Sequence, residues 1–304
     1  MPPFWTRRGF CAALASSLLP AQQRPIRLLA AGDVMLSRWI GKEALRLKDP
    51  AWPLREIAPF LSAADLTFIN LESPFRKKGP YPEKGMVFRA RPETIDGLVL
   101  AGVDVVSLAN NHVRDAGAAG LEDTLALLAE KGIAAAGLEA DCIVERAGMK
   151  FGFLAYTYDQ KNGNWKDEDA RIAGLDTAKC AAAIAALKPE CDTVLVSMHA
   201  GVEYAEKPHP SQVGFARAAI EAGAAAVIGH HPHVVQPVEE YKEGVIFYSL
   251  GNFVFDQFQR KATQKGLVAE LEFEGRRVAR YRTHGIDIVR GQPKLAVAPP
   301  KPEG

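Results

Sequence analysis

Side chains of the kinds that bind divalent metals recur along this 304-residue chain, each close behind a short apolar segment. The residues concerned are Asp33, Glu72, Asn111, His199, His231 and His233. Carboxylates, imidazoles and an amide oxygen suit zinc, manganese, iron or nickel, and the set contains no thiolate to select a softer ion. A structural zinc site would usually contain cysteine. The set therefore predicts a divalent-metal site that serves a function.

The spacing of the last two histidines bears on the number of ions. His231 and His233 are separated by one residue, so their rings can serve neighbouring coordination positions. With a bridging carboxylate, two ions can lie ~3.5–4 Å apart and activate a shared hydroxide. We therefore expect one or two ions of zinc, manganese or iron.

Each of these residues also has an ordinary structural explanation. An aspartate such as Asp33 after a strand is often a turn residue or a helix N-cap. Asn111 can supply a left-handed turn, and Glu72 can simply be solvated. A single histidine such as His199 is more often hydrogen-bonded than metal-bound. The joint occurrence of these residues, with most of the histidines following apolar segments, favours the metal site.

Other familiar kinds of site lack their motifs here. The chain has no G-x-x-x-x-G-K-[ST] phosphate loop, no G-x-S-x-G elbow and no H-E-x-x-H pair. A Ser/His/Asp triad remains open from composition alone, but no serine occupies a recognisable nucleophile setting.

Short apolar segments must position the polar residues. Buried strands are predicted at residues 26–31, 66–71, 103–108, 193–198 and 225–228, and helices at 92–101, 120–131, 177–187 and 211–223. This alternation is typical of an α/β fold. Because ligands bind at the carboxyl ends of strands in such sheets, we expect the polar residues to meet at one edge of the sheet.

The chain becomes strand-rich after residue 233. Consecutive strands are predicted at residues 234–238, 245–250, 267–273 and 278–288, and we expect them to complete a second sheet. Residues 291–304 are rich in proline and lack apolar periodicity, which predicts a tail. No linker divides the chain, so we expect a single domain.

The first 23 residues have the pattern of a targeting segment. Arg7 and Arg8 precede an apolar run at residues 10–19, which is too short to span a membrane. The segment resembles a twin-arginine export signal, with an uncleaved anchor or an N-terminal extension without a targeting role as the alternatives. We therefore expect an exported protein, periplasmic or extracellular, with membrane association left open.

The overall charge limits the class of partner. Lys and Arg total 37 against 36 for Asp and Glu, a formal net charge of +1. Such a balance gives no electrostatic reason to expect nucleic acid, so none is predicted as a partner.

A set of motifs appears in a fixed order along the chain. They are Gly-Asp-Val-Met (32–35), Asn-Leu-Glu-Ser-Pro (70–74), Ala-Asn-Asn-His (109–112), Met-His-Ala-Gly-Val-Glu-Tyr (198–204), Gly-His-His-Pro-His-Val-Val-Gln-Pro (229–237) and Tyr-Ser-Leu-Gly-Asn-Phe-Val-Phe-Asp (248–256). This set resembles the CapA family of poly-gamma-glutamate capsule biosynthesis proteins. The resemblance covers a single domain at residues 26–290.

The CapA family is similar in turn to the calcineurin-like metallophosphoesterases. The resemblance implies a four-layer α/β/β/α sandwich around a two-metal centre. It also implies metal-ligand roles for Asp33, for Glu72 as the bridging carboxylate, and for Asn111, His199, His231 and His233, with His112 as a nearby acid. The chain departs from the phosphoesterase pattern at Met35, where a histidine ligand is usual, at Glu72 in place of aspartate, and at Ala200 in place of tryptophan.

The family implies a metal-dependent protein that synthesises or processes poly-gamma-glutamate or a related envelope polymer. We expect hydrolysis or transfer of an amide or ester bond by a metal-activated water, with Asp33 and His112 in catalytic roles. Arg89, Glu203 and Asn252 are predicted to bind substrate. Two alternatives remain. One is a non-catalytic component of a capsule assembly machine with membrane partners, favoured by the missing imidazole. The other is a plain metallophosphoesterase, weakened by the same absence.

Overall fold

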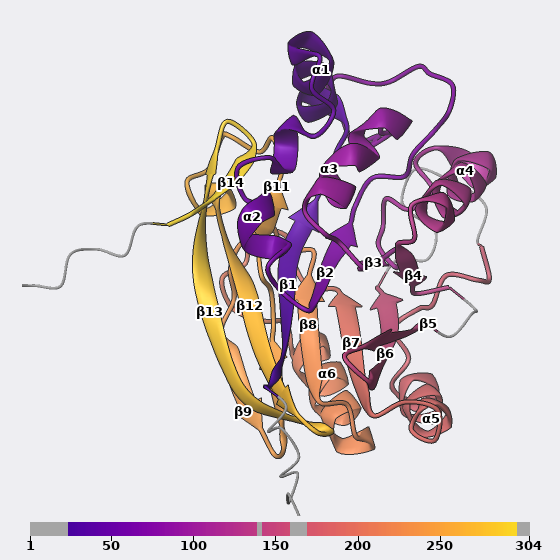
Figure 1. The fold of residues 1–304 in the computed structure, drawn as a ribbon, viewed down its shortest axis with the longest axis vertical. Coiled ribbons are helices and arrows are strands. Elements are labelled where there is room, and N and C mark those ends of the chain that lie inside the picture. The colour runs from indigo at the N-terminus through magenta and orange to yellow at the C-terminus, as the bar shows by residue number, and fades with distance from the viewer. Residues whose placement is uncertain (1–23, 139–141, 159–168, 297–304) are drawn as a thin grey trace, which may run out of the picture.

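The computed structural model describes residues 24–138, 142–158 and 169–296. The expected export segment at residues 1–23 and the last part of the expected tail lie outside these ranges. The described chain forms two β-sheets, with helices on their outer faces (Figure 1).

The first sheet has the strand order β14-β13-β12-β1-β2-β3-β4, and β11 pairs with β1 beside this path. Its strands are β1 (Ile26–Val34), β2 (Leu66–Leu71), β3 (Val105–Ser107), β4 (Ala134–Ala136), β11 (Asn252–Val254), β12 (Lys265–Glu274), β13 (Arg277–Val289) and β14 (Gln292–Leu295). β1 to β4 run parallel, so their carboxyl ends meet at the same edge.

The second sheet has the order β5-β6-β7-β8-β10-β9. Its strands are β5 (Cys142–Arg146), β6 (Met149–Thr157), β7 (Thr193–His199), β8 (Ala226–His230), β9 (Val238–Tyr241) and β10 (Gly244–Phe247). β6, β7 and β8 run parallel, which gives this sheet a carboxyl edge of its own.

Helices cover the outer face of each sheet. They are α1 (Arg38–Leu47), α2 (Ala58–Leu61), α3 (Ile95–Leu100), α4 (Gly117–Glu130), α5 (Thr177–Leu187) and α6 (Pro210–Ala222), with short 3-10 turns at Trp52–Leu54, Pro92–Thr94 and Ala262–Gln264. α1 to α4 lie with the first sheet, and α5 and α6 lie with the second (Figure 1). The four-layer α/β/β/α sandwich expected from the sequence is confirmed.

Alternation along β1 shows how the layers form. Leu28 and Ala30 belong to the apolar cluster between the two sheets, whereas Leu29 and Ala31 belong to the cluster under the helices. Successive side chains of a strand point to opposite faces, so a strand that is apolar throughout is buried on both sides. The continuous apolar runs of the sequence reflect this two-sided burial.

The C-terminal strands differ from the expectation. β12, β13 and β14 extend the first sheet through the antiparallel pairing of β12 with β1, and only β9 and β10 join the second sheet. The strand predicted at residues 234–238 is wrong, because β9 begins at Val238. The tail predicted from residue 291 is wrong at its start, since Gln292–Leu295 form β14. Pro293 is tolerated there because β14 is an edge strand.

Two glycines allow the close approach of strand ends on which the site depends. A Cβ on Gly32 would lie 2.0 Å from the carbonyl oxygen of Gly251, where β11 begins beside β1. A Cβ on Gly229 would lie 2.0 Å from the carbonyl oxygen of Tyr248. Both positions precede predicted metal ligands, so glycine lets backbone from elsewhere in the chain pack directly against them.

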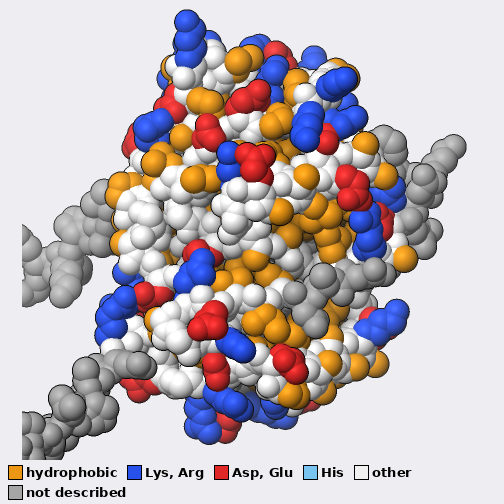
Figure 2. All heavy atoms as spheres, turned by 45° about the vertical axis from the view of Figure 1, so that its right-hand side comes forward, with side chains coloured by type: hydrophobic (Ala, Val, Ile, Leu, Met, Phe, Trp, Pro, Cys, Tyr) orange, Lys and Arg blue, Asp and Glu red, His pale blue; other side chains and the backbone are white. Residues whose placement is uncertain are grey.

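The described surface has two further properties. None of its helices has the length and apolar composition needed to cross a bilayer. On the face shown in Figure 2, lysine and arginine side chains are interspersed with aspartate and glutamate rather than gathered into a large area of one sign.

The aromatic contact between the sheets gives a test of the sandwich. Phe68 on β2 is 1% exposed and stacks on Phe153 of β6, with ring centroids 5.5 Å apart and an interplanar angle of 3°. Phe68→Ala is expected to lower the free energy of unfolding by about 3–5 kcal/mol, because it leaves a cavity between the sheets. Urea unfolding measures this change. Val99→Ala, at a position 48% exposed, is the control and should change the value by less than ~0.5 kcal/mol. Equal effects of the two substitutions would contradict the described core.

Candidate metal centre

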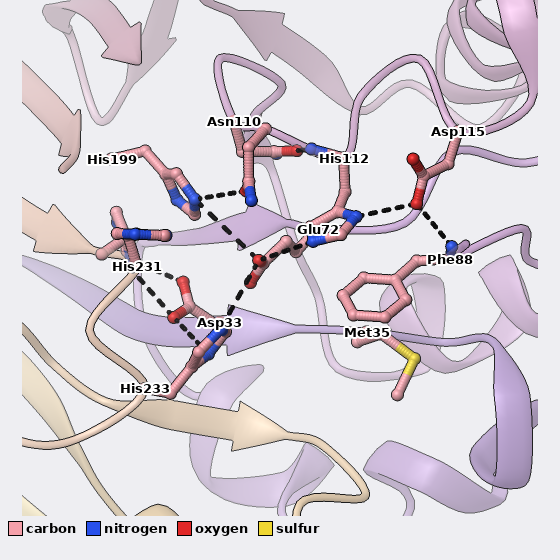
Figure 3. Close-up of polar contacts among 12 residues, drawn as sticks. Asp33, Met35, Glu72, Phe88, Asn110, His112, Asp115, His199, His231 and His233 are labelled. Atoms are coloured by element: carbon pink, nitrogen blue, oxygen red, sulfur yellow. Dashed lines mark hydrogen bonds and ion pairs between the residues drawn. The ribbon is translucent and has the colours of Figure 1, made fainter. Parts of the chain in front are cut away.

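The predicted ligands come together where the carboxyl edges of the two sheets face each other (Figure 3). β1 brings Asp33, the segment after β2 brings Glu72, and the segment after β3 brings Asn111 and His112; β7 and the segment after β8 bring His199, His231 and His233. We expected one edge of one sheet. The structure instead divides the ligands between two sheets, because β7 and β8 belong to the second.

One group of ligand atoms is compact. Asp33, Glu72 and His233 each offer an atom within 4.8 Å of the other two, and all three residues are buried. His233 Nδ1 lies 2.9 Å from Asn252 Oδ1, whose amide nitrogen donates to Gln257 and to a backbone carbonyl. This pattern places the His233 hydrogen on Nδ1 and leaves the Nε2 lone pair toward Glu72, 4.0 Å from its Oε1.

A second group shares Glu72 with the first. His199 Nε2 lies 3.9 Å from Glu72 Oε1 and 2.9 Å from Asn111 Oδ1. The ring of His231 lies 4.9 Å from that of His199, centroid to centroid. Glu72 therefore stands between two sets of donors, the arrangement expected of a bridging carboxylate.

The environment of Glu72 tests whether these residues fit a cation. Both carboxylate oxygens are buried and lack a hydrogen-bond partner among the residues that the structure describes, as does Nδ1 of His231. Burial, followed by the charge of Asp33, raises the pKa of Glu72 well above its ordinary value. An uncompensated buried carboxylate is costly, and a divalent cation among these donors would supply the missing charge. The donor set fits a divalent metal.

Asp33 has the opposite electrostatic setting. Its Oδ1 accepts a hydrogen bond of 2.8 Å from Asn70 Nδ2, and its Oδ2 accepts one of 3.2 Å from the backbone of His231. Burial raises the pKa of this carboxyl, but the nearby imidazoles of His230 and His233, whose Nδ1 atoms lie 3.4 and 3.5 Å from its oxygens, outweigh burial and hold the pKa well below its ordinary value. Asp33 is therefore held as a carboxylate, the form that binds a metal.

The two closing histidines sit on strained backbone. His231 has φ 97° and His233 has φ 60°, a region that residues with a Cβ seldom adopt. Such strain persists where the surroundings enforce it, and it is common at functional sites. Burial and the charge of His233 lower the pKa of His231 to about 3, and burial likewise lowers the pKa of His199. Neutral imidazoles are the form that a metal requires.

His112 stands beside the ligands with a carboxylate behind it. Its Nδ1 lies 2.7 Å from Asp115 Oδ2, and its Nε2 lies 3.9 Å from Glu72 Oε1. The ring of Phe88 stacks on the imidazole at 3.8 Å, and the Phe88 amide donates to the same Asp115 oxygen. The Asp115 carboxylate fixes the hydrogen on Nδ1, so Nε2 is the nitrogen presented to the centre.

Met35 stands at the sequence position where metallophosphoesterases usually have a histidine ligand. The Met35 sulfur accepts a hydrogen bond of 2.9 Å from the Ser37 hydroxyl, and its side chain points away from Asp33 and Glu72 (Figure 3). Met35 therefore does not replace the missing imidazole.

His230, which we left out of the predicted set, is fully buried with Nδ1 3.4 Å from Asp33 Oδ1.

The predicted substrate residues occupy different positions. Asn252 is fully buried behind His233, where it orients the ring. Arg89 donates to the carbonyl oxygens of Pro80 and Asp115, which places it behind the His112–Asp115 pair. Glu203 is half-buried, and its charge contributes to the raised pKa of Glu72. Of the three, Glu203 remains in a position to meet a ligand.

Sequence reasoning missed the residues that support the ligands. Asn110 donates to Asn70 and to the Leu71 carbonyl and accepts from the His112 amide, so it joins the end of β2 to the segment after β3. Asn70 and Asn110 lie inside the quoted motifs, each close to a predicted ligand, and Asp115 follows one of these motifs by three residues. Their place in those motifs was the available signal, because buried ligands need hydrogen-bonded partners behind them.

Comparison with known proteins agrees with this geometry. The model of the family described as bacterial capsule synthesis protein PGA_cap matches residues 27–257. The chain belongs to this family. The resemblance expected from the motifs is therefore confirmed over most of the domain.

Named relatives come from several organisms. The chain is 31% identical over 298 residues to the capsule biosynthesis protein CapA of Bacillus anthracis, covering 90% of this chain and 70% of that one. It is 30% identical over 273 residues to the PGA biosynthesis protein CapA of Bacillus subtilis strain 168, covering 86% and 71%. Identity is also 30%, over 288 residues, to a Mycobacterium tuberculosis protein named as a probable polyglutamine synthesis accessory protein, covering 76% and 74%.

A solved structure supports the fold. A Staphylococcus aureus protein assigned as a 5'-nucleotidase, in complex with alpha-ketoglutarate, superposes with a TM-score of 0.53 at 14% identity. The match covers 90% of this chain, which spans only 55% of that one. The capsule-family chain thus has a two-sheet sandwich of the 5'-nucleotidase and metallophosphoesterase type.

Substitution of the bridging carboxylate tests the metal centre. We expect the wild-type protein to bind one or two divalent ions and Glu72→Gln to lose most of them, because the amide removes the shared negative charge. At an ion concentration 100 times the dissociation constant, binding should raise the free energy of unfolding of the wild type by ~2.7 kcal/mol. Elemental analysis and thermal unfolding with and without a chelator measure both effects.

The control is His209→Asn, at the exposed N-cap of α6, where asparagine keeps the cap. This variant should bind metal as the wild type does. The metal-free Glu72→Gln protein should be at least as stable as the metal-free wild type, because it no longer buries an unpaired carboxylate. Full metal content in Glu72→Gln would contradict the assignment.

Proposed function

We propose that this protein is an exported, metal-dependent protein that hydrolyses or transfers an amide or ester bond in poly-gamma-glutamate or a related envelope polymer. The observation that carries the proposal is the buried Glu72 carboxylate, which has no hydrogen-bond partner within the described residues and faces the imidazoles of His112, His199 and His233 at 3.9, 3.9 and 4.0 Å. The polymer is suggested by the names of the Bacillus relatives.

The chain's residues would divide the work as follows. The metal would be held by Asp33, Glu72, Asn111, His199, His231 and His233. A divalent cation bound there supplies Lewis-acid polarisation and lowers the pKa of a water that it binds. We propose zinc, manganese or iron as the ion, because each suits these oxygen and nitrogen donors.

His112 would serve as the general acid. Its Nε2 faces the centre while Asp115 holds Nδ1–H, so a proton on Nε2 can be delivered to a leaving nitrogen or oxygen. Phe88 stacks on the ring and restricts its rotation. The Asp115 carboxylate, 2.7 Å from Nδ1, also holds the ring in the orientation that points Nε2 toward the centre.

Export is proposed from the Arg7-Arg8 segment and its apolar run, which lie outside the described residues. A twin-arginine route carries proteins that are already folded. Such a route suits a site whose ligands come from both sheets, because the sandwich must form before the site exists. A periplasmic or extracellular location follows from this proposal.

A second candidate function has its own supporting observation. Met35 is turned toward Ser37, so the imidazole usual at this position in metallophosphoesterases has no substitute there. A non-catalytic component of a capsule assembly machine, possessing a metal for stability or polymer binding, would tolerate that loss. Turnover by the metal-loaded protein separates the two candidates.

The general-acid assignment can be tested with the paired variants His112→Asn and Asp115→Asn. Each is expected to lower the turnover of metal-loaded protein on poly-gamma-glutamate by about 10²–10⁴-fold, the usual contribution of a positioned acid. Release of free amine from the polymer measures the rate, and elemental analysis should show unchanged metal content. His209→Asn is the control and should retain the wild-type rate.

Three results would count against the proposal. Wild-type rates in both variants would remove His112 from the mechanism. Loss of metal in His112→Asn would make it a ligand rather than an acid. No turnover by metal-loaded wild type on any amide or ester polymer would favour the assembly component.

A further inference from the structure

The loop that follows β11, at residues 256–261, is fixed by contacts on several sides. The Asp256 carboxylate accepts hydrogen bonds from the Arg38 guanidinium and from the backbone amide of Trp39. The ring of Phe258 packs edge-on against Trp39, with centroids 5.3 Å apart. Because both ends of the loop are held, its backbone has little freedom to move.

The end of this loop is held at the carbonyl of Arg260. Thr263 Oγ1 lies 2.7 Å from the carbonyl oxygen of Gln257 and 2.9 Å from that of Arg260. Gln264 Nε2 donates to the same Arg260 oxygen at 3.3 Å. The backbone of Arg260 is thus anchored by two side chains, which determines the direction in which its own side chain leaves the loop.

The side chain of Arg260 is exposed and lies over an aromatic ring. Its guanidinium carbon is 4.7 Å from the centroid of Tyr204. Across residues 24–138, 142–158 and 169–296, no carboxylate pairs with it. A cation stacked on a ring is attracted by the electron-rich face of the ring and keeps its N–H edges open. The contact therefore orients the guanidinium without using its donors.

Tyr204 connects this arginine to the metal centre. Its backbone amide donates to the Pro232 carbonyl at 2.8 Å, within the turn that carries His231 and His233, and its φ is 65°. Its ring lies 6.3 Å from the ring of His233. Gln257 Nε2 lies 3.4 Å from the Tyr204 hydroxyl. The tyrosine is therefore fixed against a ligand residue on one side and carries Arg260 on the other.

The acidic groups at the centre explain why a polycarboxylate ligand would need a cation such as the Arg260 guanidinium nearby. Asp33 and Glu72 are acidic groups within the centre, and Glu203 adds a carboxylate at its edge. A chain of γ-linked glutamate carries a free carboxylate on every residue, and the Glu203 carboxylate at the edge of the centre would repel these groups as the polymer approached. A guanidinium at the rim can pair with one of them through two parallel hydrogen bonds.

We propose that Arg260 binds a carboxylate of a polycarboxylate substrate at the rim of the metal centre, with Tyr204 as the residue that positions the guanidinium. This inference rests on the proposed function, since it takes the bond to be cleaved or transferred to lie at the metal centre. It names the feature of the substrate that the site selects, which is a carboxylate a short distance from the reacting bond.

The test compares the binding of two ligands by calorimetry. The ligands are hexa-γ-glutamate and the same hexamer with its carboxylates converted to amides. The proteins are the manganese-loaded wild type, Arg260→Gln, Arg260→Lys and the neighbouring control Lys261→Gln. Arg260→Gln is expected to weaken hexa-γ-glutamate binding by about 10- to 100-fold, because it removes the hydrogen bonds between the charged guanidinium and a ligand carboxylate. Its binding of the amidated hexamer and its metal content should not change.

The other variants separate geometry from charge. Arg260→Lys keeps the charge but lacks the planar fork, so it should recover only part of the affinity. Lys261→Gln removes a charge from the next position in the same loop and should bind as the wild type does. An equal loss in Lys261→Gln would overturn the assignment, because a general charge effect would then explain the result.

The remaining outcomes distinguish this inference from the function beneath it. Unchanged hexamer binding by Arg260→Gln, with tight binding by wild type, would overturn the role of Arg260 and leave the proposed function standing. Failure of the wild type to bind hexa-γ-glutamate would overturn both, because no γ-linked polycarboxylate would then be recognised. Loss of metal in Arg260→Gln would also overturn the inference, since the residue would then act through the ion.

Discussion

The structure of the site depends on one electrostatic condition, which is that the described part of the chain buries the Glu72 carboxylate without giving it a hydrogen-bond donor. Nearly every neighbouring arrangement is related to it. The nearby histidines hold Asp33 ionised, while burial holds His199 and His231 neutral, and these are the forms that a cation would require. Burial disfavours the ionised form of Glu72, and a divalent ion bound among these groups would favour it. The described fold thus holds the Glu72 carboxylate away from hydrogen-bond donors.

The two-sheet architecture follows from the same requirement. A single parallel sheet presents its strand ends in a row, whereas ligands around an ion must approach from several directions. Packing two sheets face to face lets β1, β2 and β3 supply one side and β7 and β8 the other. The apolar cluster between the sheets, which includes Phe68 and Phe153, sets their separation. Core packing therefore controls the distances among ligands that lie on different sheets.

Much of this was predictable from sequence. The apolar strands predicted the α/β class, and the polar side chains at their ends predicted the residues that meet at the site. Both predictions depend on local patterns. The membership of each sheet did not follow, because the pairing of β12 with β1 is a long-range choice that the residues of either strand do not reveal. Asn252 is predicted to bind substrate because it follows a strand-like segment, but only the fold shows that it faces His233. β14 was missed because prolines obscured an edge strand.

The position of β11 beside β1 has a consequence for how the protein is made. Asn252, which orients His233, belongs to a strand that pairs with the segment carrying Asp33, close to the beginning of the described chain. Because the ribosome synthesises the chain from its N-terminus, Asp33 lies in an incomplete sheet until β11 has been synthesised. Any metal that this site binds would then be bound only after synthesis of almost the whole domain. A chain interrupted before β11 would retain its helices and many of its strands, yet would lack the contacts that hold the ion.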